Sequence, residues 1–443
     1  MLKRLLSGLT PKTSLLSIIL VSNAFVWYYC ADNILVSLST TASFDYYAVV
    51  QVWGVNFAVL IGSAFIGARF GKRLGSRTQF LSVWMLVGAV LPFLSLIVDP
   101  SNVLGVTLLG MVFSISLGIG LPACMGYFTS QTSIETRGRL GGLMMLFTGL
   151  SVIVLNSLFT DSFMTQAVVL SAWRGFGLLS FILLKPRDEK TIAEEKPLSY
   201  KHILSQRAFI LYFVPWVMFS LVNYLNKPVL YAVLEPSAIA TLLIVENALI
   251  AVFAVIGGCL ADMMGRKRMA IIGFVTLGLG YAVLGISPEN LLAWYFHTAV
   301  DGIAWGILLV VFITTIWGDL SHNKPSDKLY AMGVFPFFIS RFLPMVIPDQ
   351  IIAAIPATAV FSFTAFFLFL AVLPLVYTPE TLPEKIMKDR ELKNYIEKAK
   401  KEVSKAQENQ GENKQCENEK GTVEFKVNLE DEEKAQEIAE KYY

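Results

Sequence analysis

The chain has 443 residues, of which 55% are hydrophobic and only 16% are charged, and its formal net charge is +2. This composition is typical of a protein embedded in a lipid bilayer, because charged side chains are costly in hydrocarbon. The near-neutral charge gives no electrostatic basis for binding nucleic acid. The four cysteines show neither disulfide spacing nor metal-ligand spacing, so we expect no bound metal.

A membrane-spanning helix needs about 20 mostly apolar residues. The first apolar run is too long for the core of a cleaved signal peptide, so it is interpreted as the first spanning helix. Runs of spanning length divide the chain into twelve expected helices, at residues 14–39, 46–67, 79–98, 103–128, 140–160, 166–184, 208–231, 237–261, 269–287, 290–317, 329–348 and 351–377. We therefore expect an all-α, multi-pass protein of the cell membrane.

Lysine and arginine gather in alternate loops of this arrangement. Cations precede the first expected helix and follow the second, fourth, sixth, eighth and tenth, whereas the other loops carry acids and a single cation, Lys227. Loops rich in lysine and arginine remain in the cytoplasm. The pattern therefore predicts that both termini are cytoplasmic.

A turn rich in glycine and cations follows the eighth expected helix. It reads Gly258-Cys259-Leu260-Ala261-Asp262-Met263-Met264-Gly265-Arg266-Lys267-Arg268. Gly265 supplies the backbone freedom that a sharp turn needs. The pattern resembles the loop signature of the major facilitator superfamily, in which it joins helices 2 and 3 and also helices 8 and 9. The resemblance covers about residues 10–383.

The resemblance implies two halves of six helices each. The N-terminal half then covers residues 1–184, a cytoplasmic linker covers 185–207, and the C-terminal half covers 208–379. Residues 380–443 form a cytoplasmic charged tail that holds 17 of the 34 acidic residues. Two interpretations of this tail stay open: a solvated extension, or a module that binds a cytoplasmic partner.

In this superfamily the acid of the turn docks on the opposite half and keeps the cytoplasmic side closed. Here Asp262 would dock at the start of the fifth helix, near Leu140. The counterpart turn in the first half keeps Arg73 and Gly75, but Lys72 stands where the pattern has the acid. The gating residues expected from both turns are Gly258, Asp262, Gly265, Arg266, Lys267, Arg268, Lys72, Arg73 and Gly75.

Ionisable side chains within spanning helices cost roughly 2.5–3.5 kcal/mol each, so each one is a candidate for function. The sequence places six of them in expected helices: Asp32, Arg174, Glu246, His297, Asp301 and Arg341. Asp301 and His297 lie one turn apart on one face of the tenth helix, with Trp305 a turn further on. Burial raises the pKa of a carboxyl toward neutrality, which suits a proton carrier. The alternative is a structural His–Asp pair.

The remaining candidates also have two interpretations each. Glu246 and Arg341 lie at similar depths, so they form either a structural ion pair or a site where Arg341 receives an anionic substrate. Asp32 is either a cavity acid near the outer mouth or an interfacial residue. Arg174 lies on a helix that is peripheral in the superfamily, which favours a structural role. Trp53, Trp216, Tyr224 and Trp305 are candidates for stacking on a substrate.

Several functions are excluded by missing motifs. The sequence has no phosphate-binding loop for ATP-driven transport and no defensible Ser–His–Asp arrangement, so we expect neither an enzyme nor a cofactor. We expect secondary active transport of a small solute by alternating access, with protons as coupling ion and Asp301 or Glu246 as carrier. Two alternatives stay open: efflux of amphipathic drugs, or a transporter-like receptor that signals through residues 380–443.

Overall fold

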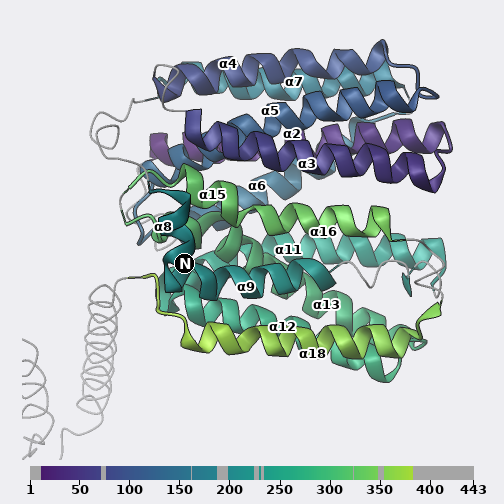
Figure 1. The fold of residues 1–443 in the computed structure, drawn as a ribbon. Coiled ribbons are helices and arrows are strands. Elements are labelled where there is room, and N and C mark those ends of the chain that lie inside the picture. The colour runs from purple at the N-terminus through teal and green to yellow at the C-terminus, as the bar shows by residue number, and fades with distance from the viewer. Residues whose placement is uncertain are drawn as a thin grey trace, which may run out of the picture. The chain divides into compact units, whose positions relative to one another are not determined.

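The computed structural model describes residues 11–70, 76–160, 162–186, 198–223, 229–230, 234–322, 324–347 and 354–382. Helices are the regular elements of these residues, and ten of them are long and apolar enough to cross a membrane. The prediction of an all-helical, multi-pass membrane protein is confirmed (Figure 1). The predicted tail covers residues 380–443, and its part beyond Leu382 lies outside the described residues.

The first half follows the predicted helices closely. Its elements are α2 (Pro11–Thr41), α3 (Tyr46–Phe70), α4 (Arg77–Val90), the 3₁₀ turn η1 (Leu91–Leu96), α5 (Val103–Ser130), α6 (Arg137–Leu158) and α7 (Phe163–Leu183). Side-chain oxygens of Ser76 and Asn102 cap the starts of α4 and α5 by accepting backbone N–H bonds. The 3₁₀ turn begins where Pro92 removes a backbone donor.

The second half departs from the predicted helices at its prolines. Its elements are α8 (Tyr200–Ser205), α9 (Arg207–Val222), α11 (Pro236–Met264), α12 (Arg266–Ile286), α13 (Leu291–Leu309), the π-helical η2 (Val310–Thr315), α14 (Ile316–Asp319), α15 (Asp327–Gly333), α16 (Phe335–Val346) and α18 (Ala357–Tyr377). The prediction of one helix over 329–348 is wrong, because the chain divides at Val334, two residues before Pro336. The last helix begins at Ala357 rather than 351, directly after Pro356.

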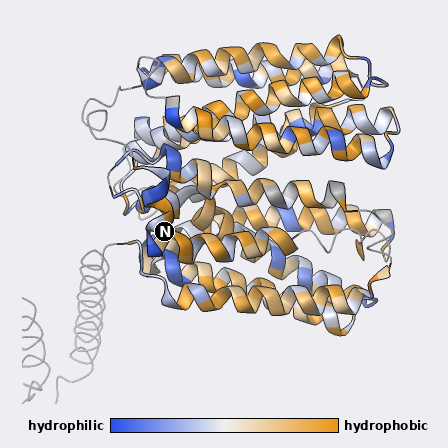
Figure 2. Ribbon diagram, viewed as in Figure 1, coloured by the Kyte–Doolittle hydropathy of each residue, from blue (hydrophilic) through white to orange (hydrophobic). Residues whose placement is uncertain are grey.

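Figure 2 shows that the middle parts of the helices consist mostly of hydrophobic residues and that hydrophilic residues gather at their ends. Helix α2 and the continuous segment from α13 to α14 are the most deeply buried of the spanning helices, whereas α11 is the least buried. The two halves meet where α6 packs on α11 and α3 packs on α16. The stacked rings of Phe57 and Phe342, with centroids 4.8 Å apart, form part of the second contact.

Small residues bring α6 and α11 into close contact. Gly138 and Gly142 on α6 face Ala254 and Gly258 on α11. A Cβ atom on Gly142 would lie 2.5 Å from the carbonyl oxygen of Ala254, and one on Gly258 would collide with the carbonyl oxygen of Gly138. Stripes of small residues permit this approach in membrane helices. The crossing therefore depends on glycine at positions where any side chain would force the two halves apart.

We predict that Gly258→Ala destabilises the protein by about 1–3 kcal/mol, because the added methyl group meets backbone atoms that cannot move aside. The measurement is the midpoint of thermal unfolding of the purified full-length chain in detergent.

The matched control is Gly62→Ala in α3, where a Cβ atom has nothing within 4 Å. This change should leave the midpoint unchanged or raise it, because alanine is favoured over glycine inside a helix. Equal midpoints for Gly258→Ala and Gly62→Ala would show that the crossing tolerates a side chain.

Candidate functional site

The loops rich in arginine and lysine lie together at one end of the helices, which we call the basic end. It is defined by Arg77, Arg137, Arg139, Arg266 and Lys328, and its hydrophilic character is visible in Figure 2. There the chain passes from α11 to α12 through Gly265, whose φ of +101° lies in the region that favours glycine.

Asp262, in the last turn of α11, contacts the start of α6 in the other half. Its carboxylate accepts hydrogen bonds from the backbone nitrogens of Gly138 at 2.9 Å and Arg139 at 2.8 Å, and from Arg139 Nε at 3.1 Å. The first N–H groups of a helix have no partner within the helix and favour a negative charge. The predicted contact between Asp262 and the start of the helix near Leu140 is therefore present; its role in gating stays a prediction.

Arg266 connects Asp262 to a second carboxylate. The fully buried guanidinium pairs with Asp262 Oδ1 at 3.0 Å and with Asp319 Oδ2 at 3.0 Å. It also donates to the carbonyl oxygens of Ala261 at 2.6 Å and, in the other half, Ile134 at 2.5 Å. Such a buried guanidinium is tolerated because its charge is paired and its donors are used.

Asp319 is shared between two arginines, because Arg137 of α6 donates to its other oxygen. We call Asp262, Arg266, Asp319 and Arg137 the buried ion cluster. Its two carboxylates and two guanidinium groups balance in charge, and it joins the halves at the basic end. The pairing of Asp319 with Arg137 was missed from sequence. The available signal was that Arg137 and Asp319 stand in corresponding loops of the two halves, each of which carries an acid and a cation.

Two further contacts join the halves beside the cluster. Arg77 Nη2 binds both carboxylate oxygens of Asp327, at 2.9 and 2.8 Å. The Thr129 hydroxyl lies 3.1 Å from the Tyr330 hydroxyl, which donates to the carbonyl oxygen of Thr314 at 2.7 Å. Thr314 lies in the π-helical segment, whose widened turn displaces backbone bonds and is frequent at functional sites.

The segment after α18 completes the cluster. Glu380 accepts from the backbone nitrogens of Arg266 at 2.8 Å and Lys267 at 3.1 Å, so it caps the start of α12. The Thr381 hydroxyl reaches Asp319 Oδ2 at 3.2 Å. We missed Glu380 in the sequence because a cap supplied from 114 positions away along the chain leaves no local pattern.

The other residues of the two turns have different surroundings. Lys267 Nζ donates to the carbonyl oxygen of Val376 at 2.6 Å, and Arg268 is exposed. The counterpart turn, with Lys72, Arg73 and Gly75, lies outside the described residues.

Three candidates for substrate or proton binding lie on successive turns of α13 and are buried. They are His297, Asp301 and Trp305. The His297 ring packs edge-on against Tyr281 of α12, with centroids 4.6 Å apart, and Trp305 packs on Phe219 of α9 at 4.8 Å. This face of α13 is therefore turned toward helices of its own half.

Asp32 is buried in α2, and Glu246 is half-buried in α11. The side chain of Arg341 lies outside the described part of the chain, so the predicted Glu246–Arg341 pair stays a prediction. Trp216 is fully buried and stacked on Phe312 at 4.7 Å. It belongs to the aromatic core of the second half, which removes it from the candidates for stacking on a substrate.

Arg174 is held entirely within the first half. Its Nη1 donates to Asn23 Oδ1 of α2 at 2.8 Å, and its guanidinium lies 4.0 Å from the centre of the Trp84 ring. Cation–π contact with tryptophan stabilises such a group where solvent is excluded. The arrangement ties α2, α4 and α7 together, in agreement with the structural role expected for this residue.

Burial along α11 changes from one end to the other. Near the basic end, Ala254, Gly258 and Asp262 are buried against α6. Farther from it, Ile244, Val245, Asn247 and Ala248 are all exposed, Ile244 by 71%. Successive residues of an α-helix point about 100° apart, so these four positions cover one continuous arc of the α11 surface. Exposed positions are therefore more frequent toward the other end, and Met263 and Met264 are the exposed residues of the last turn at the basic end.

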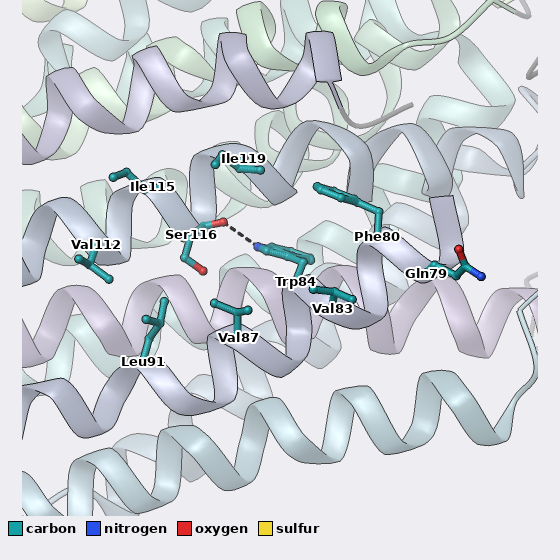
Figure 3. Close-up of a pocket in the computed structure, with 10 residues that line it drawn as sticks. All are labelled: Gln79, Phe80, Val83, Trp84, Val87, Leu91, Val112, Ile115, Ser116 and Ile119. Carbon is teal, nitrogen blue, oxygen red and sulfur yellow. Dashed lines mark hydrogen bonds between the residues drawn. The ribbon is translucent and has the colours of Figure 1, made fainter. Parts of the chain in front are cut away.

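An apolar pocket of about 740 Å³ lies between α4 and α5 in the first half (Figure 3). Trp84 lies within it and donates from Nε1 to the carbonyl oxygen of Ser116 at 2.6 Å. Gln79 and Ser116 are its polar lining residues, and the ionisable candidates lie elsewhere. Its apolar walls belong to spanning helices, which gives it the character of a lipid-facing surface rather than of a polar binding site.

No protein-family model matches the chain, and no curated protein matches it by sequence. Solved structures do match. The proton:xylose symporter XylE of the major facilitator superfamily, bound to 6-bromo-6-deoxy-D-glucose, superimposes with a TM-score of 0.64 at 15% identity, covering 84% of this chain and 96% of that one. A double-tryptophan variant of XylE gives 0.62 at 16% identity, covering 86% and 98%. The chain therefore has the fold of the major facilitator superfamily.

Proposed function

We propose that this chain is a secondary active transporter that moves a small solute by alternating access between its two halves. The observation that carries the proposal is the asymmetry of the interface between the halves. The buried ion cluster joins them at the basic end, whereas α11 is exposed toward the other end. A structure tied at one end and open at the other is what one state of such a transporter requires.

The proposal includes the topology. The ten spanning helices together with α9 and the α15–α16 pair give twelve. Cations gather at the basic end, so the positive-inside rule assigns that end and both termini to the cytoplasm. In this orientation the structure is the outward-open state, and the buried ion cluster is its closed cytoplasmic gate.

The bonds of the gate are of a kind that can be exchanged. A carboxylate at a helix start contributes about 0.3–1 kcal/mol when exposed and up to about 2 kcal/mol when partly buried. Opening the basic end would replace the contacts of Asp262 and Asp319 with water. The net cost is therefore a few kcal/mol, within reach of the binding free energy of a solute.

The solute and the coupling ion are inferred from chemistry and from the matched structures. XylE is a proton:xylose symporter and holds a glucose analogue in one of these structures. We propose a polar solute of similar size for this chain, with Asp301 or Glu246 as the proton carrier. Asp32 and Arg341 are the further candidates for contacting the solute, and Arg341 would favour an anionic one.

We predict that Asp262→Asn opens the basic end. The neutral amide cannot accept the charge-assisted bonds of the carboxylate, each worth about 1.5–3 kcal/mol. The ratio of closed to open molecules should therefore fall at least about tenfold. The measurement uses Ala254→Cys, a buried position beside Gly142, in a chain whose native cysteines are replaced by serine. Its labelling by a thiol reagent added at the basic side should be faster by that factor.

The control is Asp99→Asn in the same background. Asp99 is an exposed acid, bonded locally to Ser101, in the loop before α5. This substitution should leave labelling unchanged. Slow labelling in both variants would rule out Asp262 as a gate residue.

We predict that Asp301→Asn abolishes accumulation driven by a pH gradient, because asparagine cannot carry a proton. In reconstituted vesicles, accumulation of radiolabelled D-xylose or D-glucose should fall at least about tenfold, whereas exchange of solute across the membrane without a gradient persists.

Asp45→Asn, an exposed acid that caps the start of α3, serves as the control and should transport as the unmodified chain does. Loss of gradient-driven accumulation in Glu246→Gln instead would assign the proton to α11. Full accumulation in both variants would refute coupling through either carboxyl.

A further inference from the structure

A second, polar pocket lies at the basic end, next to the buried ion cluster. Its volume is about 270 Å³. Six of its lining residues carry a hydroxyl group: Thr129, Ser130, Thr132, Ser133, Ser321 and Ser326. Its position and lining differ from those of the candidates on α13, so it is a separate site.

Among the residues that line the pocket, cations outnumber acids. Three cations line the pocket, Arg77, Arg137 and Lys324, against one carboxylate, Glu135. The carboxylates that pair with the two arginines, Asp327 and Asp319, do not line it. Arg137 is buried in the wall, where Nε donates to the Thr132 hydroxyl at 3.1 Å and Nη1 to Asp319. Lys324 and Glu135 are exposed at the rim.

Both halves of the protein contribute walls. The lining residues from Gly126 to Arg137, with Arg77, belong to the first half, and the second half contributes Gly318, Ser321, Lys324, Pro325 and Ser326. Any movement that separates Arg137 from Asp319 also divides this pocket. A ligand that fills it therefore binds the closed basic end in preference to an open one, and stabilises it by the same free energy.

We propose that this pocket is a regulatory site for a phosphate group, which holds the basic end closed. Arginine, lysine and hydroxyl groups together are the chemistry that recognises phosphate oxygens. Five of the six hydroxyls make hydrogen bonds within the protein in this structure, so a bound phosphate would exchange some of those bonds for its own. Inorganic phosphate and a small phosphate ester are the two sources of that group. Binding does not depend on the proposed transport function, whereas its effect on closure rests on it.

The first experiment measures binding to the purified full-length chain by the rise in the midpoint of thermal unfolding with ligand concentration. The probes are inorganic phosphate and glycerol 3-phosphate, with sodium chloride at matched ionic strength. Phosphate should stabilise the chain where chloride does not. A lower dissociation constant for glycerol phosphate would identify the ester as the better ligand; the reverse would identify free phosphate.

Charge variants test the location of the site. Lys324→Gln should weaken phosphate binding about fivefold, since it removes one charge at the rim. Glu135→Gln should strengthen it, since it removes the opposing charge. Lys201→Gln, an exposed lysine of α8 outside the lining, is the matched control and should change nothing. Equal affinity in all three variants, or equal stabilisation by chloride, would overturn the proposal.

The second experiment tests closure. In the chain with its native cysteines replaced by serine, phosphate should slow the labelling of Ala254→Cys at least about threefold, and Lys324→Gln should require about fivefold more phosphate for the same effect. Binding with no effect on labelling would retain the phosphate site and refute its link to alternating access.

Discussion

The structure depends on burying four charges at the basic end, where its two halves meet. In the buried ion cluster, the Asp319 carboxylate contacts the guanidinium groups of Arg137 and Arg266. The Asp262 carboxylate contacts Arg266 and the first N–H groups of α6. Burying one of these charges alone would cost much free energy of desolvation, and pairing it with an opposite charge offsets part of that cost. One of the cluster's three ion pairs, Arg137 with Asp319, crosses between the halves, and the two pairs of Arg266 lie within the second half.

Backbone shape makes that cluster possible. Glycines on α6 and α11 let the two helices approach until the Asp262 carboxylate reaches the first N–H groups of α6. On the other side of the cluster, the π-helical segment of α13 places Thr314 against Gly141 of α6. Such a turn has a wider ring of backbone bonds than an α-helix and is less stable. The close crossing of α6 and α11 therefore lies next to a segment whose backbone hydrogen bonds are less regular.

Much of the fold could be predicted from the sequence because hydrophobic length and the positions of cations are local properties. The helix ends that were mispredicted are those with prolines, at Val334 and Ala357, where a missing N–H outweighs hydrophobicity. The contact of Asp262 was reached through resemblance to a family, since its partners lie more than 120 positions away. The roles of Asp319, Arg77 and Glu380 were missed. Each depends on a distant partner that one sequence does not reveal.

The capping of α12 by Glu380 has a consequence for how the protein is made. The start of α12 is synthesised long before Glu380, so the nascent chain carries Arg266 and Asp319 through much of its synthesis without their last partners, Glu380 and Thr381. Only when the segment after α18 has emerged does the cluster acquire its full set of bonds. The basic end is thus completed by almost the last residues of the membrane region. A chain that ends before Glu380 would contain every spanning helix but would lack the bonds that Glu380 and Thr381 make at the basic end.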